Sequence, residues 1–302
     1  MSASVYAVER IKQLMDCLVN QAVSPMVVAG NEIDQVERWL EDEKSKEQYR
    51  RELAFWVLSQ SLLKDFASAV SYTGNFNLDE WFRVLQQVQE LRASGALPLL
   101  EGVGETEYAE TFILNQYEYS GAVEIQKGDV FLDCGAFVGD TAVWALSKGA
   151  GKVYSFEPGS ESMKNLILNT QAISIAGGGV VPVPFGVGGE TARMRMVGSG
   201  SGAQLVKDES GEVMVVTLDD WCRENAVRPD FIKMDIEGAE VDALKGARGV
   251  ITQYKPKLTI CLYHRLTDMW VIPHLIKEMV PEYRFWCRKN HPNYEFVLYA
   301  TV

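Results

Sequence analysis

The stretch that most constrains the fold of this chain runs from Asp129 to Thr141. Its short apolar segment, Val130–Leu132, is closed by the acid Asp133, and two glycines follow in the spacing G-x-x-x-G. Apolar residues at helical spacing come next. This pattern predicts a buried parallel strand, a glycine turn and a helix. Glycine lets the backbone approach a ligand closely, and the first turn of a helix presents unpaired N–H groups, so the stretch is typical of a nucleotide-binding site.

A second apolar strand that ends in an acid supports this interpretation. The segment Lys152–Phe156 is followed by Glu157, which lies about 20 residues beyond the glycines, the offset at which a carboxylate reaches ribose hydroxyls. Glu157 alone is equally consistent with a solvated charge at a strand end. Its combination with the glycine turn favours the ribose-binding role.

The C-terminal two thirds of the chain alternates between predicted strands and helices. Strands are expected at 130–133, 152–156, 180–185, 230–235 and 257–263. This alternation predicts a parallel sheet covered on both faces. Because Pro182 and Pro184 cannot donate to a strand ladder, 180–185 should lie at a sheet edge, which agrees with the order 3-2-1-4. The last two strands, 283–287 and 294–300, are joined by about six residues and should form an antiparallel hairpin.

Helices are expected between these strands. Asp219 and Asp220 are interpreted as capping residues of the helix that contains Trp221. A further helix over 267–280 is expected to be interrupted at Pro273. We therefore predict an α/β fold, with a doubly wound, mostly parallel seven-stranded sheet that ends in an antiparallel hairpin.

An all-helical region is predicted to precede this sheet. Apolar and aromatic residues recur at helical spacing up to about residue 95, and the segment Leu97–Glu107 carries a proline and two glycines. We divide the chain into a helical region at 1–105 and a cofactor-binding domain at 106–302. The helical region is expected to be a substrate cap or a dimerisation surface. No pattern in the helical region is typical of catalysis.

The segment from Gly186 to Val216 interrupts the alternation. It is rich in glycine and serine, and strand-like arms at Arg193–Met196 and Val213–Val216 flank its tip. The pattern fits a β-hairpin or lid, and it also fits an ordinary mobile loop. The sequence does not decide between them.

Composition narrows the possible partners. The formal net charge is -12 and no cluster of Lys and Arg is visible, so a nucleic-acid partner is not expected. No apolar run reaches the ~18 residues that span a bilayer, and the first 20 residues do not resemble a signal peptide. The cysteines are widely spaced and are expected to be reduced. We therefore expect a cytoplasmic protein without a membrane partner.

Three segments together resemble the FkbM-type methyltransferases. They are Gly128–Asp140, Thr217–Asp220 and Phe231–Glu240, and the last is the most specific because it reads K-x-D-I-E-G-A-E after a strand. The resemblance covers roughly residues 110 to 302. It implies the class I methyltransferase fold, S-adenosyl-L-methionine as cofactor, and methyl transfer, which in relatives goes mostly to hydroxyl oxygens of small natural products or sugars.

Carried over to this sequence, the resemblance implies that the turn Asp133–Gly139 holds the methionine moiety and ribose of the cofactor. Glu157 would bind the ribose hydroxyls, and Asp235 would face the sulfonium and the acceptor. Ligands in open α/β sheets bind beyond the carboxyl ends of the strands, where these acids are expected. The predicted cofactor-binding residues are Asp133, Gly135, Ala136, Gly139, Asp140, Thr141, Glu157, Pro158, Gly186 and Asp235.

A hydroxyl acceptor is a weak nucleophile and benefits from a base, so Asp235 and His264 are the catalytic candidates. Asp235 could instead be a helix N-cap, although the functional role is favoured. For His264 a hydrogen-bonded structural role is favoured over that of the base. Glu237 and Glu240 could join Asp235 as metal ligands, but acids in a first helical turn usually interact with the helix dipole, and no metal is predicted.

Two alternatives to a methyltransferase remain at this point. A nicotinamide-dependent oxidoreductase is disfavoured because Gly135 and Gly139 lack the G-x-G-x-x-G pattern. The other alternative is a non-catalytic protein that binds the cofactor and uses its helical region to interact with partners. For an enzyme, the expected partner is a small hydroxylated acceptor, and a homodimer is possible.

Overall fold

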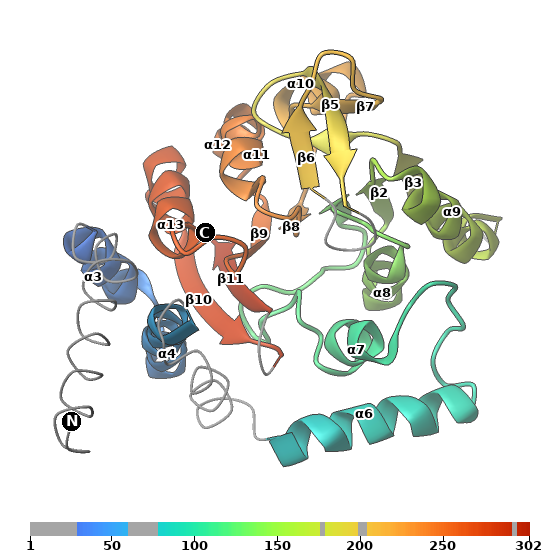
Figure 1. The fold of residues 1–302 in the computed structure, drawn as a ribbon, viewed down its shortest axis with the longest axis horizontal. Helices are drawn as coiled ribbons and strands as arrows, with labels where there is room; N and C mark the ends of the chain where they lie inside the picture. Colours follow the sequence, from blue (N-terminus) through green and yellow to red (C-terminus); the bar gives the residue numbers. More distant parts are fainter. Residues whose placement is uncertain (1–28, 60–77, 176–178, 199–203, 292–294) are drawn as a thin grey trace, which may run out of the picture.

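The computed structural model describes residues 29–59, 78–175, 179–198, 204–291 and 295–302. A seven-stranded sheet forms its centre, in the order β10-β11-β9-β8-β1-β2-β3 (Figure 1). The strands are β1 Val130–Cys134, β2 Lys152–Phe156, β3 Val180–Val183, β8 Phe231–Met234, β9 Lys257–Cys261, β10 Arg284–Lys289 and β11 Phe296–Thr301.

The predicted topology is confirmed. The five strands β3, β2, β1, β8 and β9 pair in parallel, and β3, with its proline Pro182, lies at the sheet edge. β10 and β11 form the antiparallel hairpin, and β11 also pairs antiparallel with β9, with Val297 opposite Cys261. The beginning of β11 therefore lies at the same edge of the sheet as the carboxyl ends of β8 and β9.

Both faces of the sheet are buried. Leu132 and Ile232 belong to one apolar cluster, whereas their neighbours Phe131 and Phe231 belong to another. Successive residues of a strand point to opposite faces, so the apolar runs bury alternate side chains under helices on both sides, as a parallel sheet requires. Within the described ranges, no helix combines the length and the apolar character needed to cross a membrane.

Helices follow most of the strands. They are α8 Asp140–Lys148, α9 Ser160–Ile175, α10 Leu218–Glu224, α11 Glu240–Lys245, α12 Arg248–Tyr254 and α13 Asp268–Met279. The expectation that Asp219 and Asp220 cap α10 is wrong. The N-cap of α10 is Thr217, whose hydroxyl accepts a hydrogen bond from the backbone N–H of Asp220. Asp219 instead accepts hydrogen bonds from two backbone N–H groups at the start of α12.

The expected interruption at Pro273 is wrong. α13 continues through this residue, although a proline has no N–H for the carbonyl four residues earlier, that of Met269. The hydroxyl of Tyr49 donates a hydrogen bond to that carbonyl at 3.0 Å. A contact from a distant helix therefore replaces the missing bond of the helix.

Three long described helices precede the sheet: α3 Gly30–Trp39, α4 Glu43–Ser59 and α6 Leu78–Ala93. α3 packs against α13 and α4 against β10, whereas α6 lies apart and packs against the short helix α7 Glu105–Tyr108 and the π-helix Ala109–Ile113 (Figure 1). The predicted helices at 1–28 and 60–77 lie outside the described residues. The predicted division at residue 105 stays a prediction.

The segment around the start of α4 covers the free side of β10. The outward backbone groups of this strand would otherwise have no strand partner. They are bonded as follows: the N–H of Glu41 donates to the carbonyl of Phe285, the N–H of Cys287 to the hydroxyl of Ser45, and the N–H of Lys289 to the side-chain oxygen of Gln48. The helical region thus completes the edge of the sheet.

A second, four-stranded sheet forms from the segment after β3, in the order β4-β7-β5-β6. Its strands are β4 Gly186–Val187, β5 Ala192–Val197, β6 Gln204–Lys207 and β7 Val213–Val216. The predicted arms, β5 and β7, pair antiparallel, with Arg193 opposite Met214. The hairpin partner of β5 is β6, which follows it in the chain and pairs on its other side. The glycine-rich tip at 199–203 lies outside the described residues.

Candidate active site

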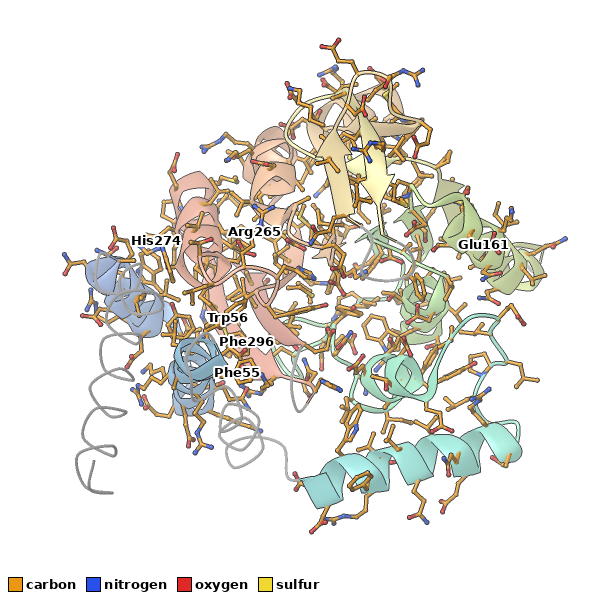
Figure 2. All side chains as sticks on the ribbon, viewed as in Figure 1. Phe55, Trp56, Glu161, Arg265, His274 and Phe296 are labelled. Atoms are coloured by element: carbon orange, nitrogen blue, oxygen red, sulfur yellow. The ribbon has the colours of Figure 1, made fainter. Side chains whose placement is uncertain are left out.

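One large cavity lies beyond the carboxyl ends of β1, β2 and β8. Its volume is about 760 Å³, and its wall also includes residues of the second sheet and of the segment that contains α7 and the π-helix. Two residues of this wall are labelled in Figure 2: Arg265, between β9 and α13, and Glu161, on α9. This is the place where open α/β sheets bind their ligands.

The turn after β1 forms the floor of the cavity and leaves no room for a side chain at Gly135. This residue has a φ of +81°, and a Cβ there would lie 1.8 Å from the backbone oxygen of Asp235. The N–H groups of Gly135 and Ala136 both donate to the carbonyl of Phe156. Gly139, with a φ of +88°, is the N-cap of α8. The turn therefore ties β1 to both neighbouring strands.

Glu157 follows β2 and points its carboxylate back to this turn. Its Oε2 accepts a hydrogen bond from the backbone N–H of Phe137 at 3.0 Å, and its Oε1 accepts one from Gly159 at 2.6 Å. Burial raises the pKa of Glu157 to about 7, against the effect of these two N–H donors. Each oxygen keeps a lone pair for a further donor such as a ligand hydroxyl.

Asp133 is fully buried and does not lie on the cavity wall. Its Oδ1 lies 3.1 Å from Nζ of Lys233, which also donates to the carbonyl of Gly135 at 2.6 Å. Burial lowers the pKa of Lys233, but the carboxylates of Asp133 and Asp235 outweigh it and the pKa is raised. Lys233, which does lie on the wall, is thus the neighbour of Asp133, and the expectation that Asp133 contacts the cofactor stays a prediction.

Lys233 was not singled out by sequence reasoning, although it lies inside the motif that carries the family resemblance. The available signal was its position as a lone charged residue within the apolar strand Phe231–Met234. A lysine is almost never buried without a partner, so such a position indicates a buried acid nearby.

Asp235 follows β8, and the hydroxyls of two tyrosines hold its carboxylate. Tyr117 donates to Oδ2 at 3.0 Å and Tyr263 donates to Oδ1 at 2.9 Å, and Nε2 of His264 lies 3.4 Å from Oδ1. Burial raises the pKa of Asp235, but the charges of Lys233 and His264 and the two hydroxyls bring it below its usual value. Asp235 is therefore ionised at neutral pH. Neither tyrosine was anticipated from the sequence.

His264 lies behind Asp235 and is not on the cavity wall. Its Nδ1 lies 2.9 Å from Oε1 of Glu240, and its Nε2 lies 3.5 Å from Oε1 of Glu237. Burial opposes the charged ring, but these acids and Asp235 raise the pKa of His264 to about 11. The ring is therefore protonated at neutral pH.

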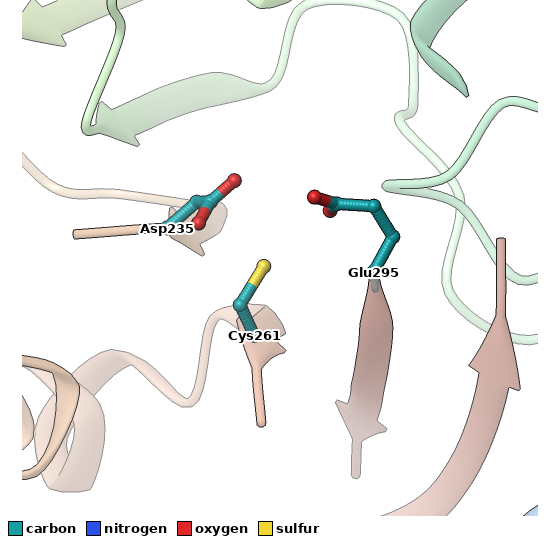
Figure 3. A group of neighbouring side chains, drawn as sticks. All are labelled: Asp235, Cys261 and Glu295. Atoms are coloured by element: carbon teal, nitrogen blue, oxygen red, sulfur yellow. The ribbon is translucent and has the colours of Figure 1, made fainter. Parts of the chain in front are cut away.

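Two further carboxylates on the wall, Glu295 and Glu110, were not anticipated. Glu295 precedes β11 and faces Asp235 across the cavity edge, with Cys261 beside them (Figure 3). Burial and the charge of Asp235 raise the pKa of Glu295 to about 8. Glu110 lies on the π-helix, and burial followed by the charge of Glu295 raises its pKa well above the usual value. Both are single acids in segments without a motif, so the sequence carried no signal for them.

The structure brings most of the predicted site residues to one cavity. Those on the wall are Gly135, Asp140, Thr141, Glu157, Pro158, Gly186 and Asp235. Those behind the wall are Asp133, Ala136, Gly139 and His264. The predicted residues are thus neighbours, but four of them contribute through the residues that they support.

Two groups of three side chains within the described residues could supply ligands to a metal. Asp235, Cys261 and Glu295 form one group (Figure 3), and Asp235, Glu237 and His264 form the other, with ligand atoms within 4.8 Å of one another in each. Burial raises the pKa of the Cys261 thiol well above its usual value, and His264 is protonated. Each would have to lose a proton before it could coordinate a cation.

The fold and the site together define a class I methyltransferase. The sheet has five parallel strands and a closing antiparallel hairpin, and the acidic strand ends surround one cavity. The sequence profile described as the methyltransferase FkbM domain matches residues 133–290, just over half of the chain. The chain belongs to the FkbM methyltransferase family.

The chain is also similar to two known proteins. The chain is 27% identical over 128 residues to the hexuronic acid methyltransferase AglP of Haloferax volcanii, a match that covers 41% of this chain and 52% of the relative. It also resembles the crystal structure of the methyltransferase FkbM from Methylobacillus flagellatus KT, with a TM-score of 0.58 and 22% identity. That likeness covers 94% of this chain and 62% of the other. The chain thus spans about half the length of the curated relative.

Proposed function

We propose that this protein transfers a methyl group from S-adenosyl-L-methionine to a hydroxyl of a small molecule or sugar. The observation that carries the proposal is a single cavity with Glu157 on the β2 side of the turn at Gly135 and Asp235 on the β8 side. A nucleoside bound at the first acid would extend over the glycine turn toward the second. The name of the relative AglP supports a sugar as acceptor.

The residues around the turn fit the proposed cofactor. The absence of a Cβ at Gly135 leaves the backbone open to a ligand, and Glu157 has lone pairs for ribose hydroxyls. Asp140 and Thr141 lie on the wall at the start of α8, where free N–H groups favour a carboxylate such as that of methionine. When bound, S-adenosyl-L-methionine supplies an electrophilic methyl group on a positively charged sulfur.

Asp235 would accept the acceptor's hydroxyl proton while the acceptor oxygen bonds to the methyl carbon and the donor's carbon–sulfur bond breaks, with S-adenosylhomocysteine as the leaving group. Its lowered pKa keeps the carboxylate ionised at neutral pH, which makes it a weak base. Its contribution is therefore mainly alignment of the hydroxyl, with proton transfer late in the step. The hydroxyls of Tyr117 and Tyr263 fix the orientation of the carboxylate.

His264 is a positioning residue in this proposal. Because the ring is protonated and lies between Asp235 and the acids Glu237 and Glu240, it stabilises the ionised form of Asp235 and cannot itself accept a proton. Replacement by glutamine should raise the pH at which the rate falls on the acid side. A merely structural role would lower the rate without shifting that profile.

A ligand titration followed by a methylation assay tests the proposal. S-adenosylhomocysteine should raise the melting temperature, whereas NAD should not, because only a ligand that binds the native state stabilises it. Labelled methyl should then appear on hydroxylated sugars, and Asp235→Asn should lower kcat about 100-fold or more with little effect on S-adenosylhomocysteine binding. Stabilisation by NAD alone, or a donor that binds without any methyl transfer to acceptors, would contradict it.

A further inference from the structure

The cavity wall carries far more acid than base. Eight wall residues have carboxylates, against one lysine and one arginine. The acids are Glu107, Glu110, Asp140, Glu157, Glu161, Asp235, Glu237 and Glu295. Burial lowers the pKa of the histidine on the wall, His291, to about 4, so this ring adds no charge at neutral pH. A donor with a cationic sulfur would offset only part of the excess.

Most of the strongly buried members of this wall already have partners. Asp140 accepts a hydrogen bond from Thr111 at 2.8 Å, Glu157 from two backbone N–H groups, and Asp235 from two tyrosines. Lys233 is shared between the carboxylate of Asp133 and a backbone carbonyl. These groups need nothing further from a ligand.

Glu110 differs from them. Its side chain is only 6% exposed, it lies on the wall, and its carboxylate has no hydrogen bond or ion pair with any residue in the described part of the chain. It is carried by a π-helix, a geometry that often places functional side chains. A buried carboxylate without a partner is costly, so this one indicates a ligand group.

Glu295 provides the second such group. Its Oε2 is buried without a hydrogen-bond partner, and its carboxylate faces that of Asp235 (Figure 3). The charge of Glu295 also acts on Glu110, because after burial it is the largest cause of the raised pKa of Glu110. A cation between them would remove this repulsion and satisfy both carboxylates.

On the basis of the methyl transfer proposed above, we propose that the acceptor carries a protonated amine, bound by Glu110 and Glu295, near the hydroxyl that faces Asp235. The acceptor class is then an amino sugar or an amino alcohol. A uronic acid is disfavoured because its carboxylate would meet this acidic wall, where Lys233 is already paired. The amine directs recognition, and the hydroxyl receives the methyl group.

Two other cations fit the same observations less well. A divalent metal would have to compete with the tyrosine hydroxyls at both oxygens of Asp235, and the neighbouring thiol of Cys261 is protonated. The amino group of the donor's own methionine would lie over the turn after β1. Glu295 immediately precedes β11, which is separated from β1 by β8 and β9.

Three ring compounds that differ in charge test the proposal directly. With S-adenosylhomocysteine bound, calorimetry should show that glucosamine binds at least about tenfold more tightly than N-acetylglucosamine, because a charge-assisted bond is lost in the amide. Glucuronic acid should bind more weakly than either. The same three compounds are then offered as methyl acceptors with labelled donor.

Variants identify the residues that recognise the amine. Glu110→Gln and Glu295→Gln should each reduce the preference for glucosamine about tenfold while the dissociation constant of S-adenosylhomocysteine changes less than about twofold. The control is Glu278→Gln, the same change of charge at an exposed residue of α13 that pairs with Arg248. It should leave the preference unchanged.

Equal binding of the three compounds, or a preference that survives both glutamine substitutions, would overturn the assignment. Weaker S-adenosylhomocysteine binding in these variants would also overturn it, because Glu110 and Glu295 would then bind the donor. Binding of Mn²⁺ that is lost with Glu295→Gln would overturn it as well. If labelled methyl goes only to neutral or uronic sugars, the amine fails and methyl transfer stands. If S-adenosylhomocysteine does not bind at all, both fail.

Discussion

The cavity has two halves that are built in different ways: the proposed donor half beside β1 and β2, and the proposed acceptor half beside β8 and β11. On the side of β1 and β2, the polar groups of Gly135 and Glu157 have partners within the protein, and they come from neighbouring stretches of chain. On the side of β8 and β11, Glu110 and Glu295 come from distant segments. Glu110 is buried on the cavity wall, and Oε2 of Glu295 is buried without a hydrogen-bond partner. The comparison teaches that a ligand that is always the same can be bound by polar groups that already have hydrogen-bond partners in the protein. A site whose buried polar groups lack such partners depends on its substrate to supply them.

Lys233 links the two halves, and its loss should have the largest effect. Lys233→Met removes the partner of the fully buried Asp133 and should lower the free energy of unfolding by about 3–5 kcal/mol, because an unpaired buried charge is left behind. Urea denaturation measures this. Lys245→Met, which removes only an exposed pair with Asp242, should leave stability nearly unchanged. A loss below about 1 kcal/mol for Lys233→Met would mean that the halves are not tied through this residue.

The tightness of the donor half is tested at Gly135. In Gly135→Ala a methyl group would meet the backbone oxygen of Asp235 at 1.8 Å in a left-handed conformation, so the turn must move. We expect a loss of stability of about 3 kcal/mol and no measurable S-adenosylhomocysteine binding. Gly30→Ala is the matched control, since a Cβ there has no neighbour within 4 Å. If the Gly135→Ala protein bound S-adenosylhomocysteine normally, the turn after β1 would have room for a side chain.

Donor binding should depend on pH through Glu157. The pKa of this carboxyl is raised to about 7, so below pH 7 it is protonated and loses an acceptor for the ribose. The affinity for S-adenosylhomocysteine should therefore fall as the pH falls, by at most about tenfold per unit. Calorimetry between pH 5.5 and pH 8.5, a range of roughly three units around this pKa, measures it. Glu157→Gln should bind about 10- to 100-fold more weakly at high pH and show a flat profile. A flat profile in the wild-type protein would argue against ribose binding.

In the acceptor half, neutralising an acid should stabilise the protein. The folded-state pKa of Glu295 is raised to about 8 from an ordinary value of 4.5, so stability is lost as the pH rises through this interval. The slope from this group is at most about 1.4 kcal/mol per pH unit. Glu295→Gln should remove it and unfold at higher urea concentration than the wild type at pH 8. A Glu295→Gln variant less stable than the wild type would contradict the inference that the carboxylate of Glu295 lacks a stabilising partner.

The arrangement of the residues in the proposed donor half could be predicted from the sequence, because these residues are close together in the chain. A strand, a glycine turn and an acid after the next strand form a local pattern, and Pro182 placed β3 at the sheet edge. The burial of Asp133 was not predictable, because no local pattern indicates which acid at a strand end is buried against Lys233.

The acceptor half was not predictable for the same reason. Glu110, Tyr117 and Glu295 meet only through the tertiary fold, and each is unremarkable among its sequence neighbours. The continuity of α13 through Pro273 likewise depends on Tyr49, more than 200 residues away. Helix propensity gave the wrong answer there because a long-range hydrogen bond replaced the missing local one.

The bonding of β10 to the start of α4 has a consequence for any attempt to shorten this protein. A chain begun at residue 106 would keep every residue of the cavity wall but would leave Phe285, Cys287 and Lys289 with bare backbone groups along an edge strand. Such an edge is a template for strand addition between copies, and aggregation would set in before catalysis could be assayed. The helices α3 and α4 therefore protect solubility, even though neither carries a residue of the cavity wall.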